Sequence, residues 1–354
     1  MSRSNLFARQ LLEWFDRHGR KNLPWQDNRS AYRVWLSEVM LQQTQVSTVI
    51  PYFERFVTRF PTVSALAAAA SDEVMKHWAG LGYYARARNL HACARQVCQQ
   101  YGGEFPQDVE LLQQLPGIGR STAGAIVAQA YQRRAVILDG NVKRVLTRYR
   151  MVAGWPGKAA VQRQLWTLAD SLTPQDRIAD YTQAIMDLGA TICRRSKPLC
   201  DQCPLLADCY AVQQDAVAQF PEKKQRVPLP TREVRVLLCY QADKPQQILL
   251  EKRPPSGIWG GLWSLPQCEP VQIPEDVIAA QYGYKVRVIK EDEPVIHSLT
   301  HLHMCIRPLR VELGNATIGV AESSVNWCDA DKVSGYGMPK PIETLVSQFF
   351  KTPD

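Results

Sequence analysis

The chain has 354 residues and a mass of 40.0 kDa, of which 45% are hydrophobic and 21% charged, values that exclude a disordered, fibrous or disulfide-stapled protein. The net charge of +8 lies entirely in residues 1–220, with 26 basic and 18 acidic side chains, whereas residues 221–354 hold 16 of each. This excess favours an anionic partner such as nucleic acid, although simple solubility explains it equally well.

The first two thirds of the chain show helical periodicity. Near the N-terminus Leu6, Phe7, Leu11, Leu12 and Phe15 recur at helical spacing. The start has no signal-peptide core and no apolar run is long enough for a membrane span, so we expect a soluble intracellular protein. The same periodicity predicts further helices over 31–42, 48–59, 71–78, 85–100, 108–115, 120–131, 141–150, 159–170 and 178–190.

The pattern changes after residue 212. A segment rich in proline and charge predicts a linker over 213–232. Alternating or short apolar runs then predict strands near 234–238, 248–250, 284–289 and 304–311, with helices at 274–282 and 340–350. We therefore expect an all-α domain over 1–212, followed by an α+β domain over 233–354.

Two carboxyl groups stand out in the helical part. Glu38 lies in the apolar stretch VWLSEVML at 34–41, where loss of water would raise its pKa and favour a proton donor. Asp139 precedes a helix pattern that begins near 142, and a helix N-terminus would keep it ionised. One protonated acid beside one carboxylate is the arrangement that cleaves glycosidic bonds, but a solvated helix face and a plain N-cap are equally simple explanations.

A glycine-containing turn, Leu115-Pro-Gly-Ile-Gly119, separates two predicted helices. Gly117 and Gly119 allow a tight turn, and the following helix presents free N–H groups to an anion. Such a hairpin holds a phosphate of a nucleic-acid backbone without reading the bases.

Four of the ten cysteines form a tight cluster, at Cys193, Cys200, Cys203 and Cys209. Four thiol ligands at this spacing predict a metal site, either zinc or an iron–sulfur cluster. The six residues between the first two cysteines exceed the usual zinc-finger spacing and favour a cluster.

Taken together, the residues resemble the helix-hairpin-helix DNA glycosylases that carry an iron–sulfur cluster and, within them, the MutY-type adenine DNA glycosylases. The resemblance rests on LPWQ at 23–26, VWLSEVMLQQTQV at 34–46, GLGYYARARNLH at 80–91, LPGIGRSTAGAI at 115–126, ILDGNVKRVL at 137–146 and the cysteine set. It implies a base-excision repair enzyme that removes adenine mispaired with 8-oxoguanine or guanine.

The resemblance also implies roles for particular residues. Glu38 would protonate the flipped adenine, and Asp139 would stabilise the sugar cation. The four cysteines would hold a 4Fe–4S cluster. Trp25 and Gln183 would line the adenine pocket. The residues implied in DNA binding are Gln43, Thr44, Tyr83, Leu115, Gly117, Gly119, Ser121 and Lys143.

Ser121 separates two branches of these enzymes. Glycosylases that also cut the strand carry a lysine nucleophile at the equivalent place, and a serine cannot form a Schiff base. The resemblance therefore implies a monofunctional glycosylase, and we assign Lys143 no catalytic role.

The C-terminal part resembles a Nudix (MutT-like) domain. The segment GIWGGLWSLP at 257–266 looks like the opening of a Nudix box, but the acidic Mg²⁺-binding helix does not follow. We therefore expect a binding scaffold that recognises the lesion through Leu299, Thr300 and His301. The familiar pattern at those positions is Phe-Ser-His, so Leu299 offers only an apolar contact.

Two alternative functions follow from the same residues. One is a pyrimidine-damage glycosylase with strand cleavage, which Ser121 and the extra domain oppose. The other is a non-catalytic iron–sulfur DNA-binding protein, which the pairing of Glu38 with Asp139 opposes. The predicted partner is duplex DNA with A:8-oxoguanine or A:G mispairs, and we expect a monomer located with the nucleoid in a bacterial cytoplasm.

Overall fold

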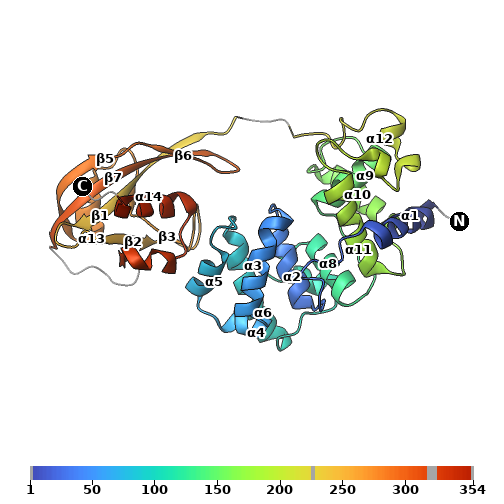
Figure 1. The fold of residues 1–354 in the computed structure, drawn as a ribbon, viewed down its shortest axis with the longest axis horizontal. Coiled ribbons are helices and arrows are strands. Elements are labelled where there is room, and N and C mark those ends of the chain that lie inside the picture. The colour runs from blue at the N-terminus through green and yellow to red at the C-terminus, as the bar shows by residue number, and fades with distance from the viewer. Residues whose placement is uncertain (1–2, 225–227, 317–324, 352–354) are drawn as a thin grey trace. The chain divides into compact units, whose positions relative to one another are not determined.

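The computed structural model describes residues 3–224, 228–316 and 325–351 (Figure 1). The chain divides into two compact units, one formed by Met1–Ala68 and Asn89–Arg226, the other by Ala69–Arg88 and Val227–Asp354. The division near 226 falls inside the predicted linker, and the exact domain boundaries stay a prediction. In the described part of the chain, no helix is long and apolar enough to cross a membrane.

The first unit is helical, as predicted. Polar N-caps begin several helices: Ser30, Asp108 and Asp139 each accept a backbone N–H of the first turn. The helices that lie wholly or mostly in this unit are α1 (Arg3–His18), α2 (Ala31–Leu41), α3 (Val46–Arg59), α4 (Val63–Ala68), α6 (Ala85–Tyr101), α7 (Val109–Gln113), α8 (Arg120–Ala130), α9 (Gly140–Arg150), α10 (Ala159–Leu172), α11 (Ile178–Asp187) and α12 (Tyr210–Gln213).

Helix α8 lies at the centre of this unit, because α2, α7 and α11 all pack against it. Its close contact with the segment before α9 requires Gly124, where an added Cβ would come within 2.2 Å of the Val136 carbonyl oxygen. The core around it contains the fully buried side chains of Trp35, Leu36 and Ile126. Helix α2, which carries Glu38, and the segment that leads into α9 therefore both pack against α8.

One element departs from the α-helical prediction over 178–190. The α-helix α11 ends at Asp187, and residues Leu188–Ile192 form a π-helix, η1. Single π-turns of this kind are frequent at functional sites. Here η1 connects Asp187 to Cys193, the first cysteine of the cluster.

The second unit contains two sheets, which confirms the predicted α+β fold class. In the first sheet β1 (Thr231–Gln241) pairs in parallel with β7 (His303–Ala316), and β4 (Gln267–Cys268), β5 (Tyr284–Glu291) and β6 (Val295–Ser298) complete it. In the second, β2 (Gln247–Lys252) lies between β3 (Trp263–Ser264) and β8 (Val325–Asp329).

Helices complete the second unit. They are α5 (Ser71–Trp78), α13 (Pro274–Tyr282) and α14 (Lys340–Lys351). The core of the first sheet includes Leu237, Val311 and Ile278 of α13. Short strands such as β6 and β8 could not be predicted from the sequence, because a strand of so few residues is too short to show a clear alternation of polar and apolar side chains.

Candidate active site

Glu38 lies on α2 with apolar neighbours on both sides. Its partners one turn away, Val34 and Trp35, are buried. Glu38 keeps part of its surface accessible, yet burial and, after it, the charge of Asp139 raise the pKa of its carboxyl to about 8. The sequence prediction of a raised pKa is therefore supported, and most Glu38 side chains are protonated at neutral pH.

Asp139 is the N-cap of α9, as its position before the helix pattern suggests. Its carboxylate accepts the Val142 N–H at 2.8 Å and the Asn141 side-chain amide at 3.1 Å. Burial raises the pKa of Asp139, and these two hydrogen bonds together with the charge of Arg144 oppose the rise. The pKa thus moves against the expectation from the helix N-terminus alone, because loss of water outweighs it.

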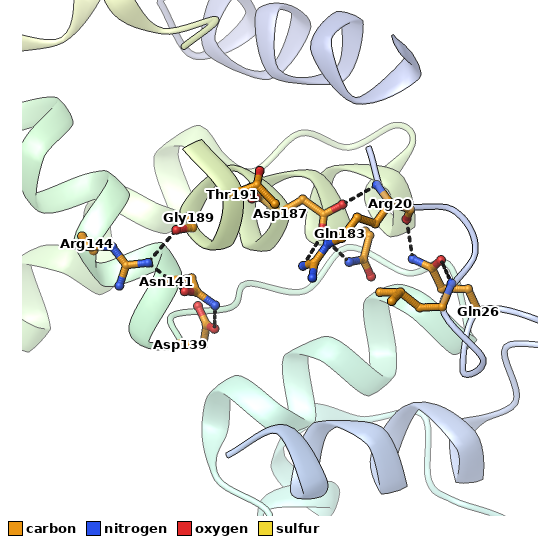
Figure 2. Close-up of polar contacts among 10 residues, drawn as sticks. Arg20, Gln26, Asp139, Asn141, Arg144, Gln183, Asp187, Gly189 and Thr191 are labelled. Atoms are coloured by element: carbon orange, nitrogen blue, oxygen red, sulfur yellow. Dashed lines mark hydrogen bonds and ion pairs between the residues drawn. The ribbon is translucent and has the colours of Figure 1, made fainter. Parts of the chain in front are cut away.

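A short chain of contacts fixes Asn141, which orients Asp139 (Figure 2). Arg144 donates to the Asn141 side-chain oxygen at 2.8 Å and to the Gly189 carbonyl oxygen at 2.6 Å. Its Nε also donates to the Cys193 carbonyl oxygen at 2.7 Å. One arginine therefore connects the Asp139 cap, the π-helix and the cysteine loop.

The two residues expected to line a base pocket are both buried. Trp25 is 5% exposed and packs edge-on against Phe53, with ring centroids 5.4 Å apart. Gln183 is 3% exposed on α11, where its amide donates to Asp187 at 2.8 Å. Asp187 in turn pairs with Arg20, at 2.6 Å from its Nη2.

The hairpin between α7 and α8 has the predicted tight turn. Leu115 is buried beneath it, and the Ile118 N–H donates to the Leu115 carbonyl oxygen. Gly117 has φ +77°, and an added Cβ would lie 2.9 Å from the Asn89 side chain, so only glycine fits without strain. Gly119 is the N-cap of α8, which leaves the first N–H groups of that helix available to an anion.

Ser121 lies on the first turn of α8 and faces the segment that leads to Asp139. Its hydroxyl accepts the Leu138 N–H at 2.9 Å. The residue thus positions the chain next to the carboxylate. Lys143 lies one turn beyond Asp139 on α9, and its backbone N–H donates to the Asp139 carbonyl oxygen.

Gln43 and Tyr83 each hold a backbone conformation that non-glycine residues rarely adopt, with φ +57° and +50°. Thr44 follows Gln43 at the end of α2, where its N–H donates to the Leu41 carbonyl oxygen. Tyr83 is 41% exposed, and the Arg86 guanidinium lies 5.3 Å from its ring centroid. Strain of this kind at exposed polar residues is frequent at binding sites.

The four clustered cysteines line one cavity, together with Arg148 and Tyr149. Burial and, to a smaller extent, the neighbouring Cys193, Cys209 and Cys200 raise the pKa of the Cys203 thiol to about 12. Among the described residues, no three His, Cys, Asp or Glu side chains come close enough to form a single-ion site. The sulfur atoms of four cysteines around one cavity are the kind of ligand that an iron–sulfur cluster requires.

The predicted lesion-reading loop is the tip of a hairpin. It joins β6 to β7, and the Leu299 N–H donates to the Leu302 carbonyl oxygen at 2.9 Å. Thr300 and His301 are exposed at the tip, and Leu299 is half-buried. Ser298 and His303 close its base through a 2.9 Å hydrogen bond.

Sequence reasoning missed four residues that hold these side chains in place: Arg20, Asn141, Arg144 and Asp187. One signal was present in the sequence, because Asp187 is an acid within the apolar stretch AIMDLGA at 184–190. A carboxylate there predicts a buried charge that needs a partner. The partner itself, 167 residues away, could not be found from the sequence.

Comparisons with known proteins match both parts of the chain. The profile described as HhH-GPD superfamily base excision DNA repair protein matches residues 36–171, and that of the NUDIX domain matches residues 235–348. The adenine DNA glycosylase of Buchnera aphidicola subsp. Schizaphis graminum is 34% identical over 97% of this chain and 99% of its own length. The human adenine DNA glycosylase is 40% identical over 73% of this chain and 57% of its own length.

Solved structures support the helical fold. A thermostable thymine-DNA glycosylase matches with a TM-score of 0.55 and 26% identity, covering 60% of this chain and 97% of its own. A non-covalent endonuclease III–DNA complex matches with a TM-score of 0.51 and 24% identity, covering 61% and 99%.

Proposed function

This chain belongs to the adenine DNA glycosylase family, and on that premise we propose that it excises adenine paired with 8-oxoguanine or guanine in duplex DNA. As a glycosylase it acts on N-glycosyl bonds. The target adenine must leave the base stack before its glycosidic bond can be reached, at a cost of a few kcal/mol.

The observation that carries the proposal is the division of protonation between Glu38 and Asp139. Burial, and after it the charge of Asp139, raises the pKa of Glu38 to about 8, which favours the protonated acid, whereas the hydrogen bonds from Val142 and Asn141 favour the ionised form of Asp139. Glu38 then donates that proton to a ring nitrogen of adenine as the C–N bond breaks, so that the base leaves neutral. The Asp139 carboxylate stabilises the oxocarbenium-like sugar. Water then forms the new C–O bond at the sugar carbon and gives up one proton, which restores the acid form of Glu38.

Water is the final acceptor of the sugar, because no lysine occupies the position of Ser121. The Ser121 hydroxyl is engaged with the Leu138 N–H and carries no amine for a Schiff base. We therefore expect an abasic product with an intact strand. Strand scission needs alkali added afterwards.

The DNA-binding surface combines backbone and side-chain groups. The turn around Gly117 and the free N–H groups after Gly119 suit a phosphate, which they hold without reading sequence. Gln43 and Tyr83 are the candidate side chains that enter the duplex, with Thr44 beside Gln43. The strained backbone at both sites supports this role. Lys143 is a further candidate contact.

The four cysteines would hold a 4Fe–4S cluster, whose contribution when bound is structural or DNA-sensing rather than chemical. The chain's own contacts shape this loop. Arg148 donates to the Cys193 sulfur at 3.4 Å and to the Arg194 carbonyl oxygen at 2.7 Å. Visible absorbance of the purified protein distinguishes the cluster from zinc, which is colourless.

The hairpin tip with Leu299, Thr300 and His301 would recognise 8-oxoguanine. The Thr300 hydroxyl and the His301 ring offer hydrogen bonds, while Leu299 offers an apolar contact. We further propose a monomer that works on nucleoid DNA in the cytoplasm. The absence of the acidic Nudix helix supports binding rather than a second hydrolysis in this unit.

The test is single-turnover base release from end-labelled duplexes that contain adenine opposite 8-oxoguanine or guanine, each read before and after alkali. A parallel duplex contains thymine glycol. Cleavage of the adenine strand only after alkali supports the proposal. Scission without alkali, activity on thymine glycol alone, or binding without base release would overturn it.

A further inference from the structure

A buried ion pair connects the loop after α1 to the end of α11 (Figure 2). Asp187 is 0% exposed, and its Oδ1 accepts from the Arg20 Nε at 2.9 Å and from Nη2 at 2.6 Å. Its Oδ2 accepts the Arg20 backbone N–H at 2.8 Å. A buried carboxylate is tolerated only with such partners, so this pair fixes both segments in one arrangement.

The same carboxylate determines which way the Gln183 amide points. Gln183 lies one turn before Asp187, and its Nε2 donates to the Asp187 Oδ1 at 2.8 Å. An ionised carboxylate accepts hydrogen bonds and cannot donate, so the amide nitrogen must face it.

The Gln183 carbonyl oxygen consequently points away from Asp187. No described residue donates a hydrogen bond to this oxygen. A fully buried oxygen in that situation would be an unsatisfied acceptor, and the Gln183 oxygen is not one. The oxygen is therefore reached by solvent, although the whole residue is only 3% exposed. A buried amide with one outward oxygen is a fixed hydrogen-bond acceptor.

Arg20 also positions the loop that carries Trp25. The Arg20 carbonyl oxygen accepts from the Gln26 side-chain amide at 2.9 Å, and the oxygen of that amide accepts the Leu23 N–H at 3.1 Å. Trp25 lies within this closed loop. The Arg20–Asp187 pair thus positions both Trp25 and Gln183.

We propose that Arg20 and Asp187 are positioning residues that determine which base the enzyme accepts. They hold the Gln183 oxygen as an acceptor for the 6-amino group of adenine. A purine with a carbonyl at that position, such as hypoxanthine, would bring two acceptors together and leave both without a hydrogen. This inference rests on the proposed adenine excision.

The test compares single-turnover excision of adenine and of hypoxanthine, each opposite 8-oxoguanine. In Asp187→Asn, the new side-chain amide can donate to Gln183, which frees the Gln183 amide to turn its nitrogen outward. The adenine-to-hypoxanthine rate ratio is expected to fall at least about tenfold from the wild-type value, the equivalent of one hydrogen bond. Arg20→Lys keeps a positive partner, so Asp187 stays ionised, the Gln183 nitrogen still faces it, and the ratio is expected to stay at the wild-type value. If Asp187→Asn does not fold, Gln183→Met removes the outward oxygen and is expected to lower the ratio in the same way.

A matched control is available on the same two segments. Arg177 joins Asp16 of α1 to Asp180 of α11 at an exposed position, with contacts of 2.6 and 2.9 Å, and does not touch Gln183. Arg177→Gln is expected to leave the rate ratio unchanged.

The outcomes separate this inference from the proposed function. Wild-type protein that releases no adenine contradicts the proposed function itself. Wild-type protein that releases adenine without preference over hypoxanthine overturns the positioning role. Equal losses on both bases in Asp187→Asn, with the ratio preserved, also overturn it, because they indicate a merely structural ion pair.

Discussion

Glu38 and Asp139 interact through their charges, because the charge of Asp139 adds to the rise that burial causes in the pKa of Glu38. No described residue donates a hydrogen bond to the Glu38 carboxyl, so nothing opposes the effect of burial on its pKa. Asp139 receives the Val142 N–H and the Asn141 amide, which partly offset the same effect. The two environments therefore support the proposed roles, with Glu38 as the acid and Asp139 as the carboxylate.

Asp139→Asn should bind mismatched DNA with nearly unchanged affinity and lose excision by about a thousandfold or more. The amide oxygen can still cap α9 at Val142, but the stabilising negative charge is gone. Single-turnover rates and gel-shift affinities measure the two effects. Asp108→Asn makes the same change at the exposed N-cap of α7 and should keep full activity. Near-normal excision by Asp139→Asn would remove this residue from its role.

Glu38→Gln should abolish excision while making the fold less sensitive to pH. The folded pKa of about 8 lies above the ordinary 4.5, so the folded state holds a proton that the unfolded state releases. Between pH 4.5 and 8 the contribution of Glu38 to the wild-type unfolding free energy therefore falls as pH rises, by on the order of 1 kcal/mol per pH unit. Urea unfolding at pH 5 and pH 8 should show Glu38→Gln gaining stability relative to wild type at pH 8.

The control for that comparison is Glu13→Gln, on the exposed face of α1. Its effect on the unfolding free energy should be small and similar at both pH values. An identical difference between Glu38→Gln and wild type at pH 5 and pH 8 would show that the Glu38 carboxyl is not perturbed.

Much of this architecture could be predicted from the sequence, because local patterns encode it. The helix over 31–42 and the cap at Asp139 follow from periodicity and residue type. The tight turn at Gly117 follows from its glycines. Contacts between distant segments could not be predicted in this way. The Arg20–Asp187 pair joins residues 167 apart, and nothing in either local sequence identifies the partner.

Burial was the other quantity that sequence reasoning misjudged. A helix N-terminus lowers the pKa of a carboxyl, but its loss of water depends on what packs around it. For Asp139 the surroundings come from several elements, and burial outweighs the cap. The π-helix at Leu188–Ile192 was missed for a similar reason, because its residues continue a helical pattern.

Ser121→Ala should lower stability without changing the surface of the protein. The Leu138 N–H would lose its acceptor at 2.9 Å, a loss that costs about 1–3 kcal/mol when the donor stays buried. Urea unfolding measures the effect. Ser171→Ala, which removes an exposed hydroxyl donating to the Leu168 carbonyl oxygen, is the matched control and should cost less than about 0.5 kcal/mol. Equal effects of the two substitutions would show that the hydrogen bond from the Leu138 N–H to Ser121 does not stabilise the fold.

His301→Ala should reduce the preference for adenine opposite 8-oxoguanine over adenine opposite guanine, by about tenfold if one hydrogen bond to the lesion is lost. His301 is exposed at a hairpin tip, so the unfolding midpoint should not change. Lys244→Ala, in the exposed turn between β1 and β2, serves as the control. Unchanged discrimination in His301→Ala would refute the reading role.

The most direct test of the central claim is the pH dependence of single-turnover adenine excision by the wild-type protein. If Glu38 must carry the proton, the rate should fall as pH rises through about 8. As the pH is lowered, the rate should begin to fall while the pH is still above the ordinary pKa of an aspartate, because burial raises the pKa of Asp139. A rate that stays constant from about pH 6 to about pH 10 would contradict the assignment of Glu38 as the acid.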